Sequence, residues 1–279
     1  MSYFANEPDH VTEIRRQLQR FVTEHAPRDK RREWDRQSTW PRDTFKQIAE
    51  MGLIGLTIPE EFGGMGQDII GATAVIDELC QAGAFLAGPY IHAAFYGGMN
   101  LAENGSEEQK AEFLPKLARG ELFLCYGLSE PNVGGDLASV ETRSAIECDE
   151  IVVNGAKRWC TGADWSDYIY CLTRSGPPED RYKNLTFLLI PTYAPGVSMQ
   201  AIEHSILRYT KSMDGYFDNV RLPKSAIVGG EENWNKGWKL LAGRALDVEK
   251  IEITAVAYGI ARAAVEEAWQ YAQEREQFG

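Results

Sequence analysis

The apolar positions in the first part of the chain recur at the spacing of α-helices. Between residues 10 and 25 they lie three or four residues apart, and Pro27 ends that pattern. A second helix opens at Trp40 and Pro41 and ends near Gly52. Three further helices are predicted at 69–84, 88–100 and 106–117. Together these patterns predict a helical N-terminal domain over residues 1–121.

The pattern changes near Leu122, where short runs of β-branched and aromatic residues alternate with turns. These runs predict strands at 122–128, 141–146, 150–159, 168–173, 185–190 and 215–220. Asn154 and Gly155 carry the strongest hairpin signal, because a type I′ turn needs both of its central residues at positive φ. Short strands separated by turns indicate a small β-barrel or sandwich, which we assign to a central domain at 122–231.

After Gly230 the helical pattern returns. The stretch 234–278 has no proline, and several of its alanines give the predicted helix a face of small side chains. A long helix with an apolar stripe cannot bury that stripe alone, so we expect residues 232–279 to be the truncated start of a C-terminal helical bundle. The predicted fold class is α+β with several domains.

The charge balance argues against a nucleic-acid partner. The chain has 29 Lys and Arg against 41 Asp and Glu, which gives a formal net charge of −12. Such a protein repels phosphate backbones unless a basic patch overrides its field. The basic residues at 28–32 are followed by Glu33 and Asp35, and we interpret them as a solvated helix end.

The cysteines, the histidines and the apolar runs further restrict the class of protein and its cellular compartment. The 5 cysteines form no CxxC pair, and Cys125, Cys160 and Cys171 are predicted to be buried free thiols, as is typical of the reducing cytosol. The 4 histidines have no metal-ligand spacing, so we expect no metal site. No apolar run is long enough to cross a bilayer, and residues 1–10 resemble no targeting peptide. We therefore predict a cytoplasmic protein.

Two clusters in the strand region could bind a flat, electron-rich ligand. In the first, Tyr126 is followed by a loop with Pro131, Gly134 and Gly135, whose backbone amides can form a nest for a ring edge; an ordinary turn is the alternative. In the second, Trp159 offers a large flat face two residues before the hydroxyl of Thr161; a tryptophan of the hydrophobic core is the alternative.

A third candidate is Glu249, on the predicted C-terminal helix. Its neighbours at helical offsets are apolar: Ala242, Ala245, Leu246, Ile253, Val256 and Ile260. A carboxylate on an apolar stripe loses hydration, which raises its pKa toward the range of a general base. The alternative is a glutamate that reaches solvent or pairs with a cation.

These clusters, with further motifs, resemble the acyl-CoA dehydrogenase family. The resemblance extends over nearly the whole chain, through the sequences PEEFGGMG at 59–66, SEP at 129–131, GGD at 134–136, NG at 154–155, WCT at 159–161, FDNVRLP at 217–223 and REQFG at 275–279. The family fold has an N-terminal helical domain, a central β domain and a C-terminal helical bundle. That arrangement agrees with the pattern found along this chain.

The resemblance implies a role for individual residues. The expected FAD contacts are Tyr126, Leu128, Ser129, Gly134, Gly135, Trp159 and Thr161, together with Arg275, Gln277 and Phe278, which would reach the FAD of a neighbouring subunit in a homo- or hetero-oligomer. Gly135, Asp247 and Lys250 correspond to substrate-side positions. Ser129 stands where the family often has Thr, and Gly135 where it usually has Ser.

The implied reaction is α,β-dehydrogenation of an acyl-CoA to the trans-2-enoyl-CoA, with electrons passed to an electron-transfer flavoprotein. Relatives continue past the Gln-Phe-Gly motif, and that part often holds the catalytic Glu. In some branches of the family the base lies instead where this chain has Glu249. Two alternatives stay open, a non-catalytic or partner-dependent subunit, and a flavin monooxygenase or oxidase of the same fold.

Overall fold

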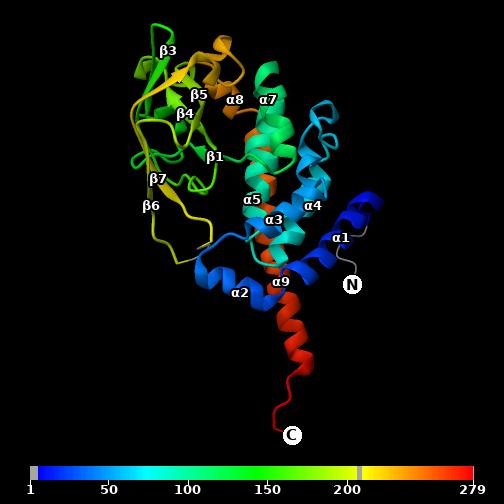
Figure 1. Cartoon of the computed structure of the whole chain (residues 1–279). Coiled ribbons are helices and arrows are strands. Elements are labelled where there is room, and N and C mark those ends of the chain that lie inside the picture. The colour runs from blue at the N-terminus through cyan, green and yellow to red at the C-terminus, as the bar shows by residue number, and fades with distance from the viewer. Residues whose placement is uncertain (1–5, 206–208, 279) are drawn as a thin grey trace.

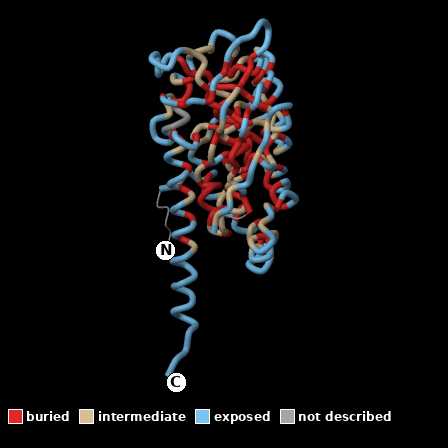
Figure 2. The backbone as a smooth tube through the Cα atoms, turned by 90° about the vertical axis from the view of Figure 1, so that its left-hand side faces the viewer, coloured by how far each residue is buried: buried red, intermediate tan, exposed pale blue. Residues whose placement is uncertain are grey.

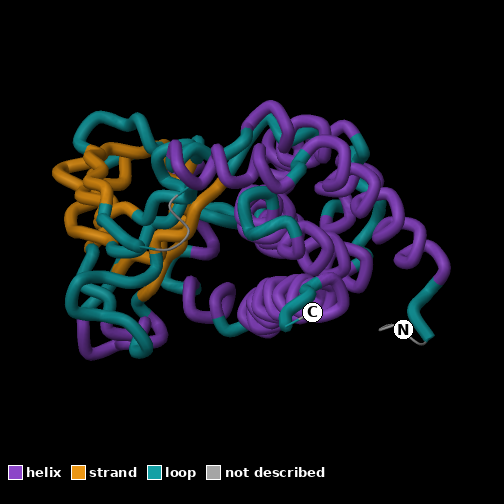
Figure 3. The backbone as a smooth tube through the Cα atoms, turned by 90° about the horizontal axis from the view of Figure 1, so that it is seen from below, coloured by secondary structure: helices purple, strands orange, loops and turns teal. Residues whose placement is uncertain are grey.

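The computed structural model describes residues 6–205 and 209–278, and within them not the side chains of 244–246. Helices form one side of the molecule and strands the other (Figures 1 and 3). The helices before the sheet are α1 (Asp9–His25), α2 (Arg28–Gln37), α3 (Arg42–Glu50), α4 (Ile69–Gln81), α5 (Ala87–Ile91), α6 (Asn100–Asn104) and α7 (Glu107–Ala118). The predicted helical N-terminal part is confirmed.

The predicted helix at 88–100 is a continuous rod with an unusual centre. Between α5 and α6 the backbone is π-helical over His92–Met99, labelled η3. A π-helical turn widens the helix and is frequent at functional sites. This segment presents His92 and Tyr96 to the same side, where the candidate site lies.

The basic stretch after Pro27 is the exposed N-terminal end of a separate helix, α2, which agrees with a solvated helix end, although the helix itself was not predicted. Only Trp34 of α2 is buried, so its sequence lacks an apolar period that could be recognised. Ser38 ends α2 in the left-handed conformation at φ 51°.

The strands form one curled, seven-stranded sheet. They are β1 (Leu124–Gly127), β2 (Arg143–Glu147), β3 (Glu150–Lys157), β4 (Tyr168–Arg174), β5 (Leu185–Pro191), β6 (Val197–Ala201) and β7 (Met213–Pro223). Their order is β1-β4-β2-β3-β7-β6, and β5 also pairs with β4. Strand β6 was not predicted because, as a half-exposed edge strand, it has no buried apolar run.

The predicted hairpin turn at Asn154 and Gly155 is wrong. Both residues lie inside β3, and the β2–β3 hairpin turns at Cys148 and Asp149, where Cys148 has φ 56°. Gly155 instead marks a bulge with φ 146°, where an added Cβ would lie 2.6 Å from the Cα of Thr142. The requirement for glycine at this position therefore comes from close packing and not from a turn.

Two helices follow the sheet, α8 (Gly237–Leu241) and α9 (Arg244–Glu274). Helix α9 packs along α4, and its C-terminal half extends beyond the rest of the molecule with an exposed surface (Figures 1 and 2). The predicted continuous helical stretch is therefore interrupted between α8 and α9 near Gly243, the N-cap of α9.

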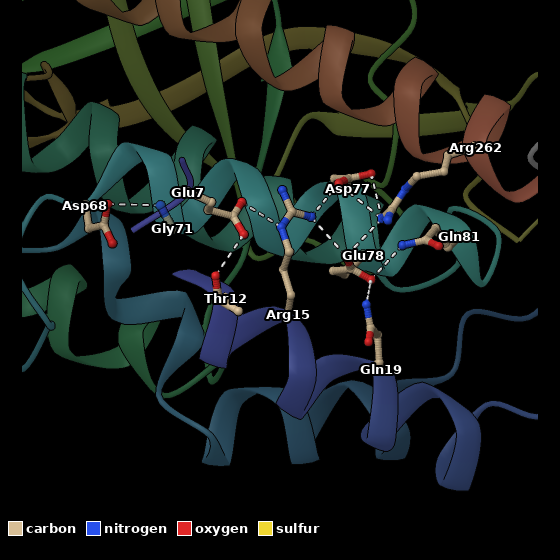
Figure 4. A network of polar contacts seen from close by, with 10 residues as sticks. All are labelled: Glu7, Thr12, Arg15, Gln19, Asp68, Gly71, Asp77, Glu78, Gln81 and Arg262. Carbon is tan, nitrogen blue, oxygen red and sulfur yellow. Dashed lines mark hydrogen bonds and ion pairs between the residues drawn. The ribbon is translucent and has the colours of Figure 1, made fainter. Parts of the chain in front are cut away.

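A buried network of charges holds α9 against α1 and α4 (Figure 4). Arg262 of α9 donates to both oxygens of Asp77 at 3.2 Å and to Glu78 at 2.9 Å. Arg15 of α1 donates to the same two carboxylates. Because buried charges are stable only when paired, this network fixes the rotation of α9 about its axis.

Several sequence predictions about composition can be compared with the described residues. Cys125, Cys160 and Cys171 are buried free thiols, as predicted. Within 6–205 and 209–278 we find no group of three metal-ligating side chains and no helix long and apolar enough to cross a membrane.

Candidate functional site

A cavity of about 340 Å³ lies where the helices meet the sheet. Its wall comes from five separate parts of the chain: α5 with η3 and the residues just before them, β1 with the segment after it, the segment after β3, the segment before β7, and α9. The lining residues are Ala84, Gly88, Ile91, His92, Tyr96, Tyr126, Leu128, Ser129, Arg158, Trp159, Thr161, Tyr209, Thr210, Glu249, Ile253 and Val256. Residues from each of the three clusters selected from the sequence therefore line one cavity.

The segment after β1 is held by a buried ion pair. Lys157 of β3 donates to Glu130 at 2.8 Å and to the carbonyl oxygen of Leu128 at 2.9 Å, and its side chain is fully buried. Glu130 also accepts backbone N–H groups of residues 141 and 142. Burial tends to raise the pKa of Glu130, but Lys157 and these hydrogen bonds hold it below its usual value. The pair fixes Leu128 and Ser129 against the cavity.

Trp159 forms an exposed wall of the cavity. It has φ 65°, a conformation that is rare for a bulky side chain, and it is 56% exposed, so it is no core tryptophan. Arg158 beside it makes two hydrogen bonds of 2.8 Å to Asp214 and lies 5.7 Å from the centre of the Trp159 ring. The hydroxyl of Thr161 lies 2.8 Å from that of Ser212.

Glu249 faces the cavity from α9, where burial raises the pKa of its carboxyl. Two stacked rings lie opposite, Tyr96 and Tyr126, with their centres 4.0 Å apart. Asn100 donates to the Tyr126 hydroxyl at 2.5 Å. Burial is the main cause that raises the pKa of both phenols, and the nearby Glu249 adds to it.

The continuous apolar stripe expected around Glu249 is only partly present. Ala242 caps α8 and does not belong to α9, and Ile260 is half-exposed; the side chains of Ala245 and Leu246 lie outside the described part. Ile253 and Val256 do line the cavity beside Glu249. Burial at the cavity wall therefore raises the pKa of Glu249, although the apolar stripe around it is incomplete.

The remaining residues selected from the sequence lie away from the cavity wall. Gly134 and Gly135 are in an exposed loop, and a Cβ at either position would meet open space. Asp247 and Lys250 pair with each other at 3.0 Å on the exposed side of α9. Arg275, Gln277 and Phe278 follow α9 and are exposed. Their binding roles stay predictions.

The sequence reasoning missed the helical wall of the cavity. His92 and Tyr96 of η3 line it. Tyr209 and Thr210, from the segment before β7, also line the cavity, and Glu252 is buried on the same face of α9 as Glu249. Gly88, His92 and Tyr96 are four residues apart, a spacing that places them on one helical face and is the only local signal for this wall.

Three family models match consecutive parts of the chain. They describe the N-terminal domain of acyl-CoA dehydrogenases at residues 8–121, the middle domain at 125–220 and the C-terminal domain at 235–279. Among curated relatives, a 3-(aryl)acrylate reductase of Clostridium sporogenes is 32% identical over 95% of this chain and 70% of its own length.

Other relatives are longer than this chain. A probable acyl-CoA dehydrogenase of Bacillus subtilis is 33% identical over 88% of this chain and 64% of its own length. A (2S)-methylsuccinyl-CoA dehydrogenase of Cereibacter sphaeroides is 34% identical over 95% of this chain. This chain spans 50% of the length of that second relative.

Solved structures show the same fold. A complex of glutaryl-coenzyme A dehydrogenase with glutaryl-CoA superposes with a TM-score of 0.91 at 24% identity, over 99% of this chain and 69% of the other. A probable acyl-CoA dehydrogenase from Mycobacterium abscessus gives 0.86 at 29% identity, over 99% and 72%. A structure described as the electron transferring flavoprotein of Acidaminococcus fermentans superposes with a TM-score of 0.89 at 26% identity. The match covers 100% of this chain and 72% of the other.

Proposed function

This chain belongs to the acyl-CoA dehydrogenase family, and we propose that it dehydrogenates an acyl-CoA thioester to the trans-2-enoyl-CoA with Glu249 as the base. One observation carries the proposal. The half-buried Glu249 faces the same cavity as the exposed ring of Trp159 and the segment that holds Ser129. A base, a flat aromatic surface and hydrogen-bonding groups around one space are what such a reaction needs.

Members of this family are FAD-binding flavoproteins, and the cavity fits the flat part of that cofactor. Trp159 presents an exposed ring on which a flavin can stack, and the hydroxyls of Ser129 and Thr161 line the same cavity. A volume of about 340 Å³ suits a ring system and a short acyl head, since ligand sites range from roughly 300 to 1,000 Å³. Bound FAD supplies the acceptor for the hydride that leaves the β-carbon.

The chain itself supplies a base of suitable strength. Glu249 would take the proton from the α-carbon, and its half-buried position favours this, because burial raises the pKa of its carboxyl above the ordinary value. The stacked rings of Tyr96 and Tyr126 line the same cavity as Glu249.

We further propose the partners that the family resemblance implies. These are an acyl-CoA substrate, an electron-transfer flavoprotein as electron acceptor, and neighbouring subunits in an oligomer. The likeness to a chain studied with the flavoprotein of A. fermentans supports the second of them. The cytoplasm is the proposed compartment, on the evidence of the buried, reduced cysteines.

The test is anaerobic flavin reduction by acyl-CoA in Glu249→Gln, after loading with FAD. We expect the rate to fall by about 10²–10⁴, the usual effect of losing a placed general base, with FAD still bound. Glu266→Gln, at an exposed position of the same helix, is the matched control and should keep the parent rate.

Three other outcomes would change the proposal. If Glu249→Gln reduces its flavin within a few-fold of the parent, Glu249 is structural and another group is the base. A parent protein that binds FAD but is never bleached by acyl-CoA would favour a non-catalytic or partner-dependent subunit. Rapid reoxidation of the reduced flavin by oxygen, with product formed from oxygen, would favour an oxidase or monooxygenase.

A further inference from the structure

A second cavity, of about 630 Å³, lies between α2 and the turn that joins α4 to α5. We call it the arginine cavity. Its lining residues are Arg28, Arg31, Arg32, Asp35, Arg36, Ala82, Gly83 and Phe85. It shares no lining residue with the cavity that Glu249 faces, so the dehydrogenation proposed above does not account for it.

Four arginines line this cavity beside a single aspartate. Arg31, Arg32 and Arg36 lie three, four and eight positions after Arg28, a spacing that places all four along one face of α2. Like charges at such spacings destabilise a helix. The chain as a whole has a net charge of −12, so this positive face is a local exception to its charge balance.

The described part of the chain gives these arginines few partners. Arg28 forms an ion pair with Glu267 of α9. Arg31, Arg32 and Arg36 form no ion pair with any described residue, and Arg36 donates only to the backbone carbonyl of Arg32. Three guanidinium groups at the cavity are therefore available to a ligand.

The charge of Arg31 is the least well compensated. The residue is half-buried, and its Nε is shut off from solvent without a hydrogen-bond partner among the described residues. Burial lowers the pKa of Arg31 and the charge of Arg28 lowers it further, while Glu267 offsets part of this. Because a guanidinium keeps its proton even so, the cost of burying its charge persists until an anion comes close.

The opposite wall of the cavity is small and uncharged. Gly83 has φ 86°, and a Cβ added there would lie 2.9 Å from Cε2 of Phe85. A side chain at this position would be strained and would crowd the space that Arg31 and Arg32 border. Guanidinium groups bind phosphate oxygens through paired N–H donors, and a phosphate group carries more negative charge than a carboxylate.

We propose that the arginine cavity binds a phosphate or pyrophosphate group, held by Arg31, Arg32 and Arg36. The group can belong to a soluble phosphorylated molecule or to the headgroup of a phospholipid. Either would supply the negative charge that the described part of the chain does not. The inference does not rest on the proposed dehydrogenation, because the two cavities have no residue in common.

The first measurement is calorimetric titration of the FAD-loaded protein with sodium pyrophosphate in a phosphate-free buffer of low ionic strength. We expect one site per chain with a Kd below about 1 mM, and weaker binding at high salt because salt screens the attraction. Flotation with phosphatidylcholine vesicles, with and without phosphatidic acid, separates the two sources. Binding to the phosphatidic acid vesicles that pyrophosphate displaces assigns the headgroup, and pyrophosphate binding without flotation assigns a soluble ligand.

Variants assign the binding to this cavity. Arg31→Met should weaken pyrophosphate binding by about tenfold or more, the effect of losing hydrogen bonds to a charged group. The double variant Arg32→Met with Arg36→Met changes exposed positions alone and should weaken binding similarly, which keeps the test valid if Arg31→Met is unstable. Arg20→Met removes the same charge from an exposed position of α1 and should keep the parent Kd.

The outcomes are independent of the proposed function, because flavin reduction by acyl-CoA should stay at the parent rate in all these variants. If pyrophosphate does not bind in this range, or binds the parent and both arginine variants equally, the inference is wrong and the arginines form a solvated face. Binding that Arg20→Met weakens as much as Arg31→Met would reflect overall charge, and would equally overturn it.

Discussion

Replacement of Lys157 by methionine tests whether the buried ion pair holds the segment after β1, with Leu128 and Ser129, in place. The Lys157 side chain is 0% exposed and that of Glu130 is 4% exposed, and their charged atoms are 2.8 Å apart. Methionine keeps most of the volume of lysine but removes the charge. Glu130 then stays buried without its cation, and the carbonyl oxygen of Leu128 loses a donor.

The expected loss of stability depends on the hydrogen-bond donors that remain around Glu130. Removing one partner of a buried ion pair costs about 3–5 kcal/mol, because the other charge is left uncompensated. Glu130 keeps two backbone donors, from residues 141 and 142, so we expect the lower end, about 3 kcal/mol. In the double variant Lys157→Met with Glu130→Gln no charge is left buried, and most of the lost stability should return.

The assay is urea unfolding of the FAD-loaded protein, with FAD affinity measured in parallel. A loss of about 3 kcal/mol corresponds to a midpoint lower by about 1–3 M urea. Lys183→Met, at an exposed position, is the matched control and should change the free energy of unfolding by less than about 0.5 kcal/mol. If Lys157→Met is as stable as that control, or if the double variant is no better than the single one, the pair does not hold this segment.

Two further substitutions test the buried carboxylates. Burial of Glu252, with a smaller effect of Glu249, raises the pKa of its carboxyl well above the ordinary 4.5. The folded protein then binds that proton more tightly than the unfolded chain, so stability falls as pH rises above about 4.5. Glu252→Gln should therefore raise Tm more at pH 8 than at pH 5. An equal change in Tm at the two pH values would contradict the raised pKa of Glu252. Arg262→Met should cost about 3–5 kcal/mol in urea unfolding, since it leaves Asp77 and Glu78 with less positive charge nearby. The matched control Arg28→Met breaks an exposed pair with Glu267 and should cost under about 1 kcal/mol; similar losses would refute the role of the network.

Most of the fold could be predicted because its elements carry local signals. Helices α1 and α7 each bury one face and expose the other, so their apolar period is visible in the sequence. Trp159 and Glu249 could also be selected from local signals. Trp159 is a large ring next to a hydroxyl residue at the end of a strand, and Glu249 is a carboxylate among apolar helix positions. The structure brings both to one cavity.

Three of the errors share one physical cause, which is that the decisive contacts are distant in the sequence. Gly155 resembled a turn glycine, but its neighbour Thr142 on another segment determines the backbone conformation. The stripe around Glu249 was expected to be buried, yet Ile253 is half-exposed, since it borders an open cavity. His92 gave no signal beyond its helical spacing from Gly88 and Tyr96, because its hydrogen-bond partner is the carbonyl of Leu124 on β1.

The two acidic residues of α9 show which step from sequence to function needs the tertiary structure. Glu249 and Glu252 are three residues apart and differ by about 60° around the helix axis, so the pattern alone cannot tell which of them reaches the cavity. In the structure Glu249 lines the cavity and Glu252 is buried beside it, at 2% exposure. That choice depends on the rotation of α9, and the ion pairs of Arg262 with Asp77 and Glu78 fix the rotation. The network in Figure 4 therefore acts on the proposed chemistry from a distance, because it determines which carboxylate can take the substrate proton.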